Sequence, residues 1–348
     1  MHMADALLAP AVAATMYVAS GAVAGVSVHK LRKDDEPQKL PTMAVTAALV
    51  FAGQMINYTI PGTGSSGHMC GGMLLSALLG PQAGFLSMIV ILAIQCLFFA
   101  DGGLLALGAN VWNMAFYGCF VGYYLIWRPI MRSRLFGAGK GAQRARIILS
   151  SILGCVITLQ LGAFSVVLET SLSGITELPF GAFVALMQPI HLAIGLIEGL
   201  ITSAVLVFVF ESRPELLRDV NARPGEAKRS LKATIAILAV VALVVGGGLS
   251  LLASSNPDGL EWALFGNAEA GYAENMALDE DDFGVQSDAA DKAAAIQEHT
   301  SLLPDYAFTN SDSAAGTTVS GIVGAAMVAA VALLICFAGG FFRKKHSK

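Results

Sequence analysis

The chain contains 348 residues, of which 55% are hydrophobic and only 13% are charged. A soluble domain typically carries about 25% charged residues, so this composition excludes an ordinary soluble globular domain and predicts an all-α membrane protein. The net charge of −4 conceals an uneven distribution of basic and acidic residues along the chain. The five cysteines are scattered and have no CxxC spacing, which argues against a disulfide framework.

Nine apolar runs follow one another, and most of them reach the ~20 residues that span a bilayer. They cover roughly residues 9–28, 42–56, 69–80, 83–100, 104–127, 147–168, 190–210, 231–253 and 318–342. The run at 69–80 is short and begins with glycines, so we expect a half-depth helix that is buried in protein. The pattern predicts about seven helices or half-helices in residues 1–210 and two helices beyond them.

The basic residues gather in four connections, which together hold 20 of the 21 lysines and arginines: residues 30–40, 128–146, 211–232 and the carboxyl-terminal tail. Residues 254–317 hold one lysine and thirteen acidic residues. Because basic connections remain in the cytoplasm, we expect nine crossings of a bacterial inner membrane, with the amino terminus outside and the carboxyl terminus inside. Segment 254–317 then faces outward.

The chain divides into two units. Residues 1–210 form the first unit, and residues 231–348 form a second unit with the outward segment 254–317 between its two helices. The charged linker 211–230, ESRPELLRDVNARPGEAKRS, joins them. Segment 254–317 is too poor in apolar residues to build a core, so we expect it to be largely extended or disordered.

The chain begins Met-His, which places several nitrogen donors close together. The α-amine of Met1, the backbone amide of His2 and its imidazole could ligate Ni(II) or Cu(II) in one plane; alternatively, His2 has no role. The expected topology places His2 on the same side of the membrane as His68, which lies in the glycine-rich stretch IPGTGSSGHMCGGML (60–74). An ionisable group in such a stretch is a functional candidate, although a histidine could also satisfy a loop carbonyl.

Other polar residues are candidates for supporting roles. Ser65 and Ser66 lie beside His68, and Asp101 and Asn110 lie in a second outward turn, FFADGGLLALGAN (98–110). Asp101 could orient a histidine or be a solvated turn residue, and Asn110 could cap a helix or brace a loop.

His191 and Glu198 are seven residues apart, on one face of an expected helix. They could form a buried ionisable pair, a metal site or a packing contact. Gly195 lies between these two residues and Gly199 follows Glu198, and the two glycines form a small-residue seam.

The stretch FGAGKGAQ (136–143) fails the phosphate-loop pattern, so ATP-driven transport would need an ATPase partner.

Four motifs, in order, resemble the CbiM/NikM family, the nickel and cobalt substrate-capture subunits of energy-coupling factor transporters: the initial MH, GTGSSGH (62–68), DGGLLALGAN (101–110) and HLAIGLIEGLIT (191–202). The resemblance covers roughly residues 1–210. NPDGLEWA (256–263) resembles the PDGLE signature of the accessory CbiN/NikN subunit, so the chain looks like a fused M–N protein.

The resemblance implies that the Met1 amine, the amide and imidazole nitrogens of His2, and His68 hold the transported Ni²⁺ or Co²⁺. It implies a CbiQ/NikQ-like membrane coupling subunit and CbiO/NikO-like cytoplasmic ATPases as partners, with no enzymatic activity and no cofactor in this chain itself. Two alternatives remain. One is an intramembrane serine protease of the rhomboid type, with Ser66 as nucleophile and His191 as base; the other is a passive metal channel or sensor.

Overall fold

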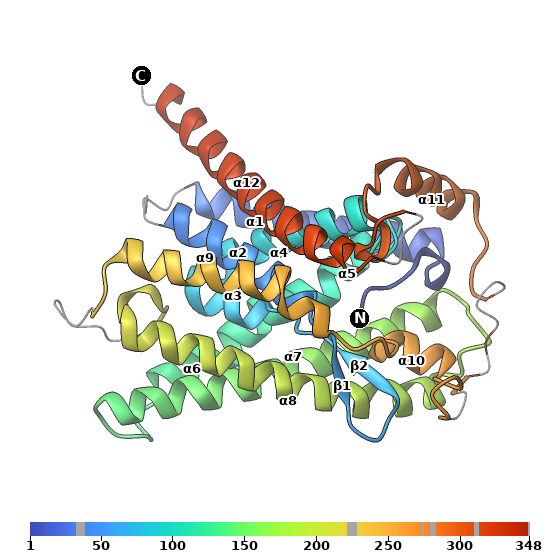
Figure 1. The fold of residues 1–348 in the computed structure, drawn as a ribbon, viewed down its shortest axis with the longest axis horizontal. Helices are drawn as coiled ribbons and strands as arrows, with labels where there is room; N and C mark the ends of the chain where they lie inside the picture. The colour runs from blue at the N-terminus through green and yellow to red at the C-terminus, as the bar shows by residue number, and fades with distance from the viewer. Residues whose placement is uncertain are drawn as a thin grey trace.

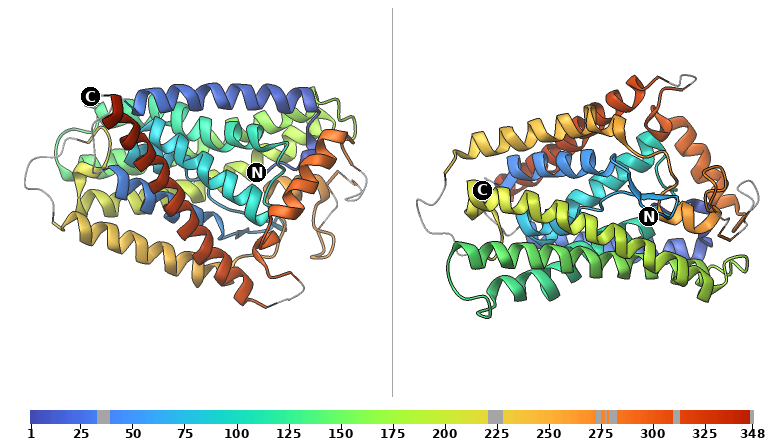
Figure 2. Two further views of the ribbon diagram at one scale, coloured as in Figure 1. Left: turned by 90° about the horizontal axis from the view of Figure 1, so that it is seen from above. Right: turned by 60° about the horizontal axis from the view of Figure 1, so that its bottom comes forward.

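The computed structural model describes residues 1–32, 39–220, 228–272, 275–276, 278, 283–309 and 313–346. Its helices pack side by side along one direction, and the amino terminus lies at one end of the bundle, beside a short β-hairpin (Figures 1 and 2). The first unit contains η1 (Asp5–Leu7), α1 (Pro10–Leu31), α2 (Lys39–Gln54), β1 (Tyr58–Ile60), β2 (Ser65–Gly67), α3 (Gly72–Leu79), α4 (Pro81–Phe99), α5 (Leu107–Asn110), the π-helical segment η2 (Val111–Trp127), α6 (Arg128–Arg132), α7 (Lys140–Leu172) and α8 (Phe180–Ser212).

The predicted apolar runs correspond to helices, which confirms the all-α membrane class. In the part of the chain that the structure describes, five helical segments are long and apolar enough to cross a membrane: α1, α4, α7, α8 and Ala315–Ile335 of the last helix. The helices at Pro41–Gln54 and Leu231–Gly247 are apolar but shorter. All eight residues of α3 are buried, as expected for a half-depth helix enclosed by protein.

Small residues bring the two longest helices of the first unit together. A Cβ atom added to Gly195 of α8 would lie 2.9 Å from the Cα of Val156 in α7, and one added to Gly199 would lie 2.6 Å from the Cα of Ile152. These distances leave no room for a side chain, so the small-residue seam predicted at Gly195 and Gly199 is a packing contact between backbones.

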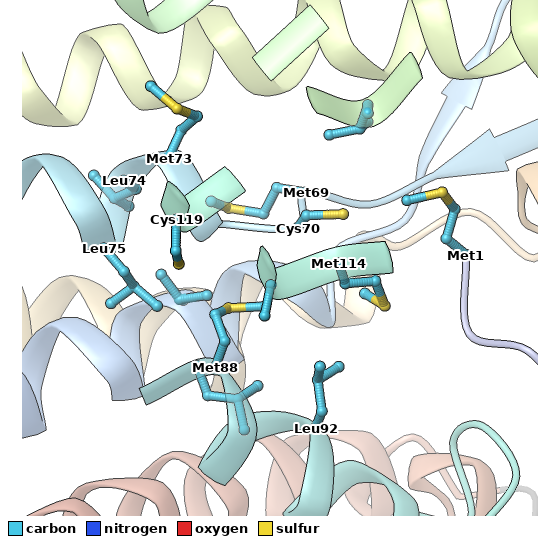
Figure 3. Close-up of a cluster of buried hydrophobic side chains, with 14 of the residues drawn as sticks. Met1, Met69, Cys70, Met73, Leu74, Leu75, Met88, Leu92, Met114 and Cys119 are labelled. Carbon is cyan, nitrogen blue, oxygen red and sulfur yellow. The ribbon is translucent and has the colours of Figure 1, made fainter. Parts of the chain in front are cut away.

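The core of the first unit is rich in sulfur. Figure 3 shows the side chains of Met69, Cys70, Met73, Met114 and Cys119 gathered with buried leucines, and Met1 at the edge of this cluster. Cys70, Cys96, Cys119 and Cys155 are buried free thiols. The interpretation of these four cysteines as small core residues is therefore confirmed.

The second unit adds α9 (Leu231–Gly247), η4 (Leu249–Leu252), α10 (Gly259–Phe265), α11 (Asp288–Thr300), η5 (Pro304–Tyr306) and α12 (Ala315–His346). The long helices α9 and α12 pack on α2, and Gly246 and Gly321 allow their backbones to meet. Part of the linker, residues 221–227, lies outside the described residues.

The prediction that segment 254–317 is largely extended or disordered is wrong where the described residues form helices. It contains α10, α11 and η5, which lie over the end of the bundle where the amino terminus is found (Figure 1). Leu260, Ala263 and Leu264 of α10 are buried. Helix α10 needs no core of its own, because these apolar residues are buried against the first unit. The acidic stretch 279–282 lies outside the described residues.

Candidate metal centre

A β-hairpin presents His68 at the end of the bundle. Strands β1 and β2 pair antiparallel, with Tyr58 opposite Gly67 and Ile60 opposite Ser65. The turn between them contains Gly62 and Gly64 at φ of 78° and 74°, in the left-handed region that favours glycine. The chain leaves β2 directly into His68, whose Nδ1 lies 3.1 Å from the carbonyl oxygen of Met69.

The segment after His68 is braced by helices of the first unit. The carboxylate of Glu198 in α8 accepts two backbone hydrogen bonds, from Cys70 N and Gly71 N, each 2.9 Å long. Gln54 of α2 donates to the carbonyl of Cys70 at 2.8 Å. Glu198 is 1% exposed, and its two oxygens satisfy backbone groups that would otherwise be unpaired. Among the readings open for Glu198, the structure favours a structural brace.

The amino terminus enters the same end of the bundle from the other side. The backbone N–H of Met3 donates to Asn110 Oδ1 at 2.7 Å. Its carbonyl accepts hydrogen bonds from Asn110 Nδ2 at 3.2 Å and from the N–H of Gly103 at 2.9 Å. Asn110 therefore acts as a brace for the amino-terminal segment.

His2 and His68 meet as the shared topology predicted. Their rings are stacked, with centroids 5.3 Å apart and planes at 22°. The Nδ1 atom of His2 lies 3.0 Å from Asp101 Oδ1, and its Nε2 atom lies 3.3 Å from Gln95 Oε1. Asp101 therefore contacts the imidazole, and it also accepts a hydrogen bond from the hydroxyl of Tyr306 in the second unit at 2.5 Å.

The amine of Met1 forms an ion pair with a carboxylate of the second unit. The distance from the amine to Asp258 Oδ2 is 2.9 Å, and the same oxygen lies 3.9 Å from His68 Nε2. The amine and the two imidazoles are nearly inaccessible to solvent, whereas the side chain of Asp258 is 21% exposed. Asp258 thus lies between the buried nitrogens and the solvent.

Burial and this ion pair move the pKa values of the site in opposite directions. Burial disfavours charge on the Met1 amine, but the Asp258 carboxylate outweighs it and raises the amine's pKa above its usual 8.0. Burial, and then the charge of the amine, lowers the pKa of His68 to about 4. Burial also lowers the pKa of His2. Near neutral pH the imidazoles are therefore uncharged and the amine is protonated.

His191 lies at the inner side of the same site. It lines a small cavity of about 10 Å³, measured as the space open to the centre of a water-sized sphere, together with Met1, Gly67, His68, Cys70, Leu159, Ile194, Asp258 and Gly259. Its Nδ1 atom lies 2.8 Å from the carbonyl of Met187, and its Nε2 atom is buried and has no hydrogen-bond partner among the described residues. His191 is therefore beside the amino terminus, while Glu198 is occupied with the loop.

Ser65 and Ser66 do not face a reacting group. Both are fully buried. Ser66 Oγ donates to the carbonyl of Asn256 at 2.7 Å, and its N–H donates to the carbonyl of Pro257 at 2.8 Å. Ser65 Oγ donates to the carbonyl of Ser66 at 3.0 Å. The two bonds of Ser66 dock the second unit on the hairpin. Ser66 and His191 are not bonded to each other, because each bonds to a different group.

Sequence reasoning missed two residues of the site, Asp258 and Gln95. Asp258 belongs to the PDGLE motif, but nothing in the local pattern links it to a residue 257 positions away. Within the described ranges, no three His, Cys, Asp or Glu side chains are grouped to hold an ion.

Comparison with known proteins gives the same division of the chain. Residues 2–216 match the family described as the cobalt uptake substrate-specific transmembrane region, CbiM, and residues 232–339 match the PDGLE domain. A crystal structure of a truncated transition-metal transporter superimposes with a TM-score of 0.52 at 32% identity, covering 61% of this chain and 99% of that one.

Curated relatives share this organisation. The chain is 37% identical over 334 residues to a putative fused nickel transport protein, NikMN, from Archaeoglobus fulgidus, covering 95% of this chain and 96% of the relative. It is 30% identical to the fused nickel transport protein NikMN from Rhodobacter capsulatus, covering 95% of each. A cobalt transport protein, CbiM, from Sorangium cellulosum is 31% identical and covers 65% of this chain.

These relatives are transport components, so the alternative of a rhomboid-type protease is wrong. The chain is a multi-pass membrane protein. It belongs to the CbiM family of substrate components of nickel and cobalt transporters, and it carries a PDGLE domain fused behind that region.

Proposed function

We propose that this chain captures Ni²⁺ or Co²⁺ through the amine of Met1, the amide and imidazole nitrogens of His2, and the imidazole of His68, for ATP-driven uptake. The observation that carries the proposal is the convergence of these groups. The stacked rings of His2 and His68 lie 5.3 Å apart, and Met1 and His68 line one cavity. Planar nitrogen donor sets suit Ni(II).

Binding would exchange existing contacts for bonds to the metal. The Met1 amine must lose a proton and leave Asp258, the backbone amide of His2 must lose its proton to ligate, and a ring nitrogen of His2 must leave Asp101 or Gln95. Asp101, Gln95 and Asn110 would then orient the ligands from behind. His191, with an unpaired Nε2 at the cavity, is the reserve donor if His68 does not ligate.

The proposed partners are a membrane coupling subunit and cytoplasmic ATPases, with the amino terminus outside a bacterial inner membrane. Residues 136–143 lack a phosphate loop, so energy would have to come from another chain. Two full-length relatives are named nickel transport proteins, so Ni²⁺ is the first ion to test and Co²⁺ the second.

The test is calorimetric titration of the purified full chain with Ni²⁺ and Co²⁺. Insertion of one alanine between Met1 and His2 should reduce affinity by more than the roughly 10–100-fold that loss of a supporting residue causes, because it separates the amine from the imidazole. His68→Ala should have a comparable effect. His299→Ala, at an exposed histidine of α11, is the matched control and should bind like the wild type.

Wild-type affinity in the insertion variant would contradict the role of the amino terminus. Wild-type affinity in His68→Ala would transfer the second ligand to His191. Uptake into vesicles that contain this chain alone, without coupling and ATPase subunits, would contradict the ATP-driven part of the proposal.

A further inference from the structure

We infer that Asp258, in the second unit, is a positioning residue that holds the amino terminus at the metal centre before the ion arrives. The inference rests on the proposed function, because it concerns the same ligand, the Met1 amine. It assigns the PDGLE motif of the second unit a role in the candidate metal centre of the first unit.

The two ends of the amino-terminal segment are held by different units. Met3 is fixed by Asn110 and Gly103, both in the first unit. The polar contact of the Met1 amine in the described structure is Asp258 Oδ2, at 2.9 Å. Without that carboxylate, a buried ammonium would lack an anion, and burial of an unpaired charge is strongly unfavourable. Met1, the first residue of the chain, would then leave the cavity.

The two carboxylate oxygens of Asp258 have different hydrogen-bond partners. Oδ1 accepts hydrogen bonds from the backbone N–H groups of Leu260 and Glu261, both at 2.9 Å, and so caps helix α10. Oδ2 faces the Met1 amine. The side chain of Glu261 completes a capping box by accepting from the N–H of Asp258. The helix cap therefore fixes the rotamer that points Oδ2 at the amine.

Helix α10 is in turn fixed to the hairpin that carries His68. Trp262 Nε1 donates to the carbonyl of Thr63 at 2.9 Å, and Asn267 Nδ2 donates to the carbonyl of Gly64 at 2.8 Å. Gly259 fits where a Cβ atom would lie 2.9 Å from Ile194 and 3.2 Å from His191. The carboxylate is thus held at a defined position relative to both halves of the metal centre.

A terminus held in place should bind the ion in one step. In the wild type, the observed rate of binding should rise linearly with metal concentration. If Asp258 is lost, the terminus must first return to the site, so the rate should level off at high metal concentration. Preorganisation of this kind strengthens binding by removing the ordering cost from the binding step.

The experiment compares Asp258→Asn, Asp258→Glu and Glu261→Gln in the full chain. Asparagine caps helices as well as aspartate, so Asp258→Asn keeps the cap on its one oxygen and turns an amide nitrogen toward the Met1 amine. Glu261→Gln changes the neighbouring acid of the same cap without touching the amine. Thermal unfolding of each variant establishes that it is folded.

Two measurements are made on each variant. The first is acetylation of the terminal amine by acetic anhydride, followed by mass spectrometry of the amino-terminal peptide. The second is stopped-flow binding of Ni²⁺. In Asp258→Asn we expect acetylation about tenfold faster, the scale of a lost hydrogen bond between charged groups, and a binding rate that saturates. Asp258→Glu should restore part of the protection, and Glu261→Gln should behave like the wild type.

Unchanged acetylation in Asp258→Asn would overturn the inference, because other contacts would then hold the terminus. Faster Ni²⁺ binding that stays linear would also overturn it, because Asp258 would then be a competitor of the metal. Equal effects of Asp258→Asn and Glu261→Gln would overturn it in favour of the helix cap.

Failure of the proposed function is recognised separately. If His68→Ala and the alanine insertion bind Ni²⁺ like the wild type, the ligand set is wrong whatever Asp258 does. The acetylation of Met1 still reports on the position of the amine in that case, because it requires no metal.

Discussion

The two halves of the candidate metal centre are supported in different ways. The His68 half is braced from inside the bundle, by Glu198 of α8 and Gln54 of α2. The half that carries Met1 and His2 is held largely at the outer surface, where Asp258 of the second unit pairs with the amine and Tyr306 bonds to Asp101. The loop after His68 is thus braced by helices of the first unit, whereas the Met1 amine pairs with a carboxylate of the second unit.

This difference indicates that the two halves of the candidate metal centre differ in rigidity. A loop braced by fully buried hydrogen bonds is rigid, because each lost bond would leave a buried polar group unpaired. A terminus held by a partly exposed ion pair can be released and bound again at smaller cost. The geometry therefore suits a fixed ligand, His68, and a movable one, the amino terminus.

The half of the metal centre that carries His68 should lose the most Ni²⁺ affinity on mutation. Glu198→Ala removes the acceptor of two buried N–H groups, each worth about 1–3 kcal/mol when left unpaired. We expect Ni²⁺ affinity to fall on the order of 1000-fold, with a lower melting temperature. Glu198→Gln, which retains one acceptor oxygen, should show an intermediate loss in the same titration.

Glu211→Ala is the matched control for that variant. Glu211 lies at the end of the same helix, where its carboxylate pairs with Arg144 and Lys228. Pairs at a surface contribute about 0–1 kcal/mol, so binding should be unchanged. A Glu198→Ala protein with wild-type affinity would show that the His68 half does not depend on this brace.

The half of the metal centre that carries the Met1 amine should govern how Ni²⁺ affinity depends on pH. The pKa of His68 is lowered to about 4, so its imidazole is uncharged between pH 6 and 8 and loses no proton when it ligates. The pKa of the Met1 amine is raised above 8.0, so a bound ion must displace its proton throughout this range. Affinity should rise at least 100-fold from pH 6 to pH 8, which is tenfold per unit for the amine proton, and the proton that the backbone amide of His2 loses on ligation should add to this slope.

Titration calorimetry in buffers of different ionisation enthalpy measures this proton release directly. Asp258→Asn is the control, because without the carboxylate the amine loses its proton at lower pH and its contribution to the rise in affinity should end earlier. An affinity that is flat between pH 6 and 8 would exclude the amine as a ligand. The ion pair should also stabilise the fold below pH 8, and this contribution should be lost as the pH rises through the raised pKa of the amine.

The smallest effect is expected at the inner anchor of the amino terminus. Asn110→Ala removes two hydrogen bonds to the backbone of Met3, each worth about 0.5–1.5 kcal/mol. We expect Ni²⁺ affinity to fall about tenfold, with acetylation of the Met1 amine only slightly faster because Asp258 still holds it. Gln82→Ala, which removes a contact with Tyr124 far along α4, should bind normally.

A loss in Asn110→Ala as large as in Glu198→Ala would remove the contrast between the two halves. It would show that the amino-terminal segment is as rigidly built as the loop that carries His68.

The sequence by itself determined the class of the protein and the candidate ligands. Long apolar runs must form helices in a membrane, because unpaired backbone groups are too costly in lipid, and the glycines at 195 and 199 predicted where two helices meet. The juxtaposition of His2 and His68 followed from topology, since both were expected in segments on one side of the membrane. Each of these inferences depends on a local sequence pattern, or on whether the number of membrane crossings between two segments is odd or even.

Only the tertiary structure decided how those ligands are supported. Glu198 is a brace for Cys70 and Gly71, and Asp258 reaches an amine 257 residues away. Segment 254–317 has too few apolar residues to fold alone, yet α10 and α11 are ordered on the surface that the first unit provides. Such contacts join distant parts of the chain, and their energies come from burial and charge pairing that arise only when the units pack together.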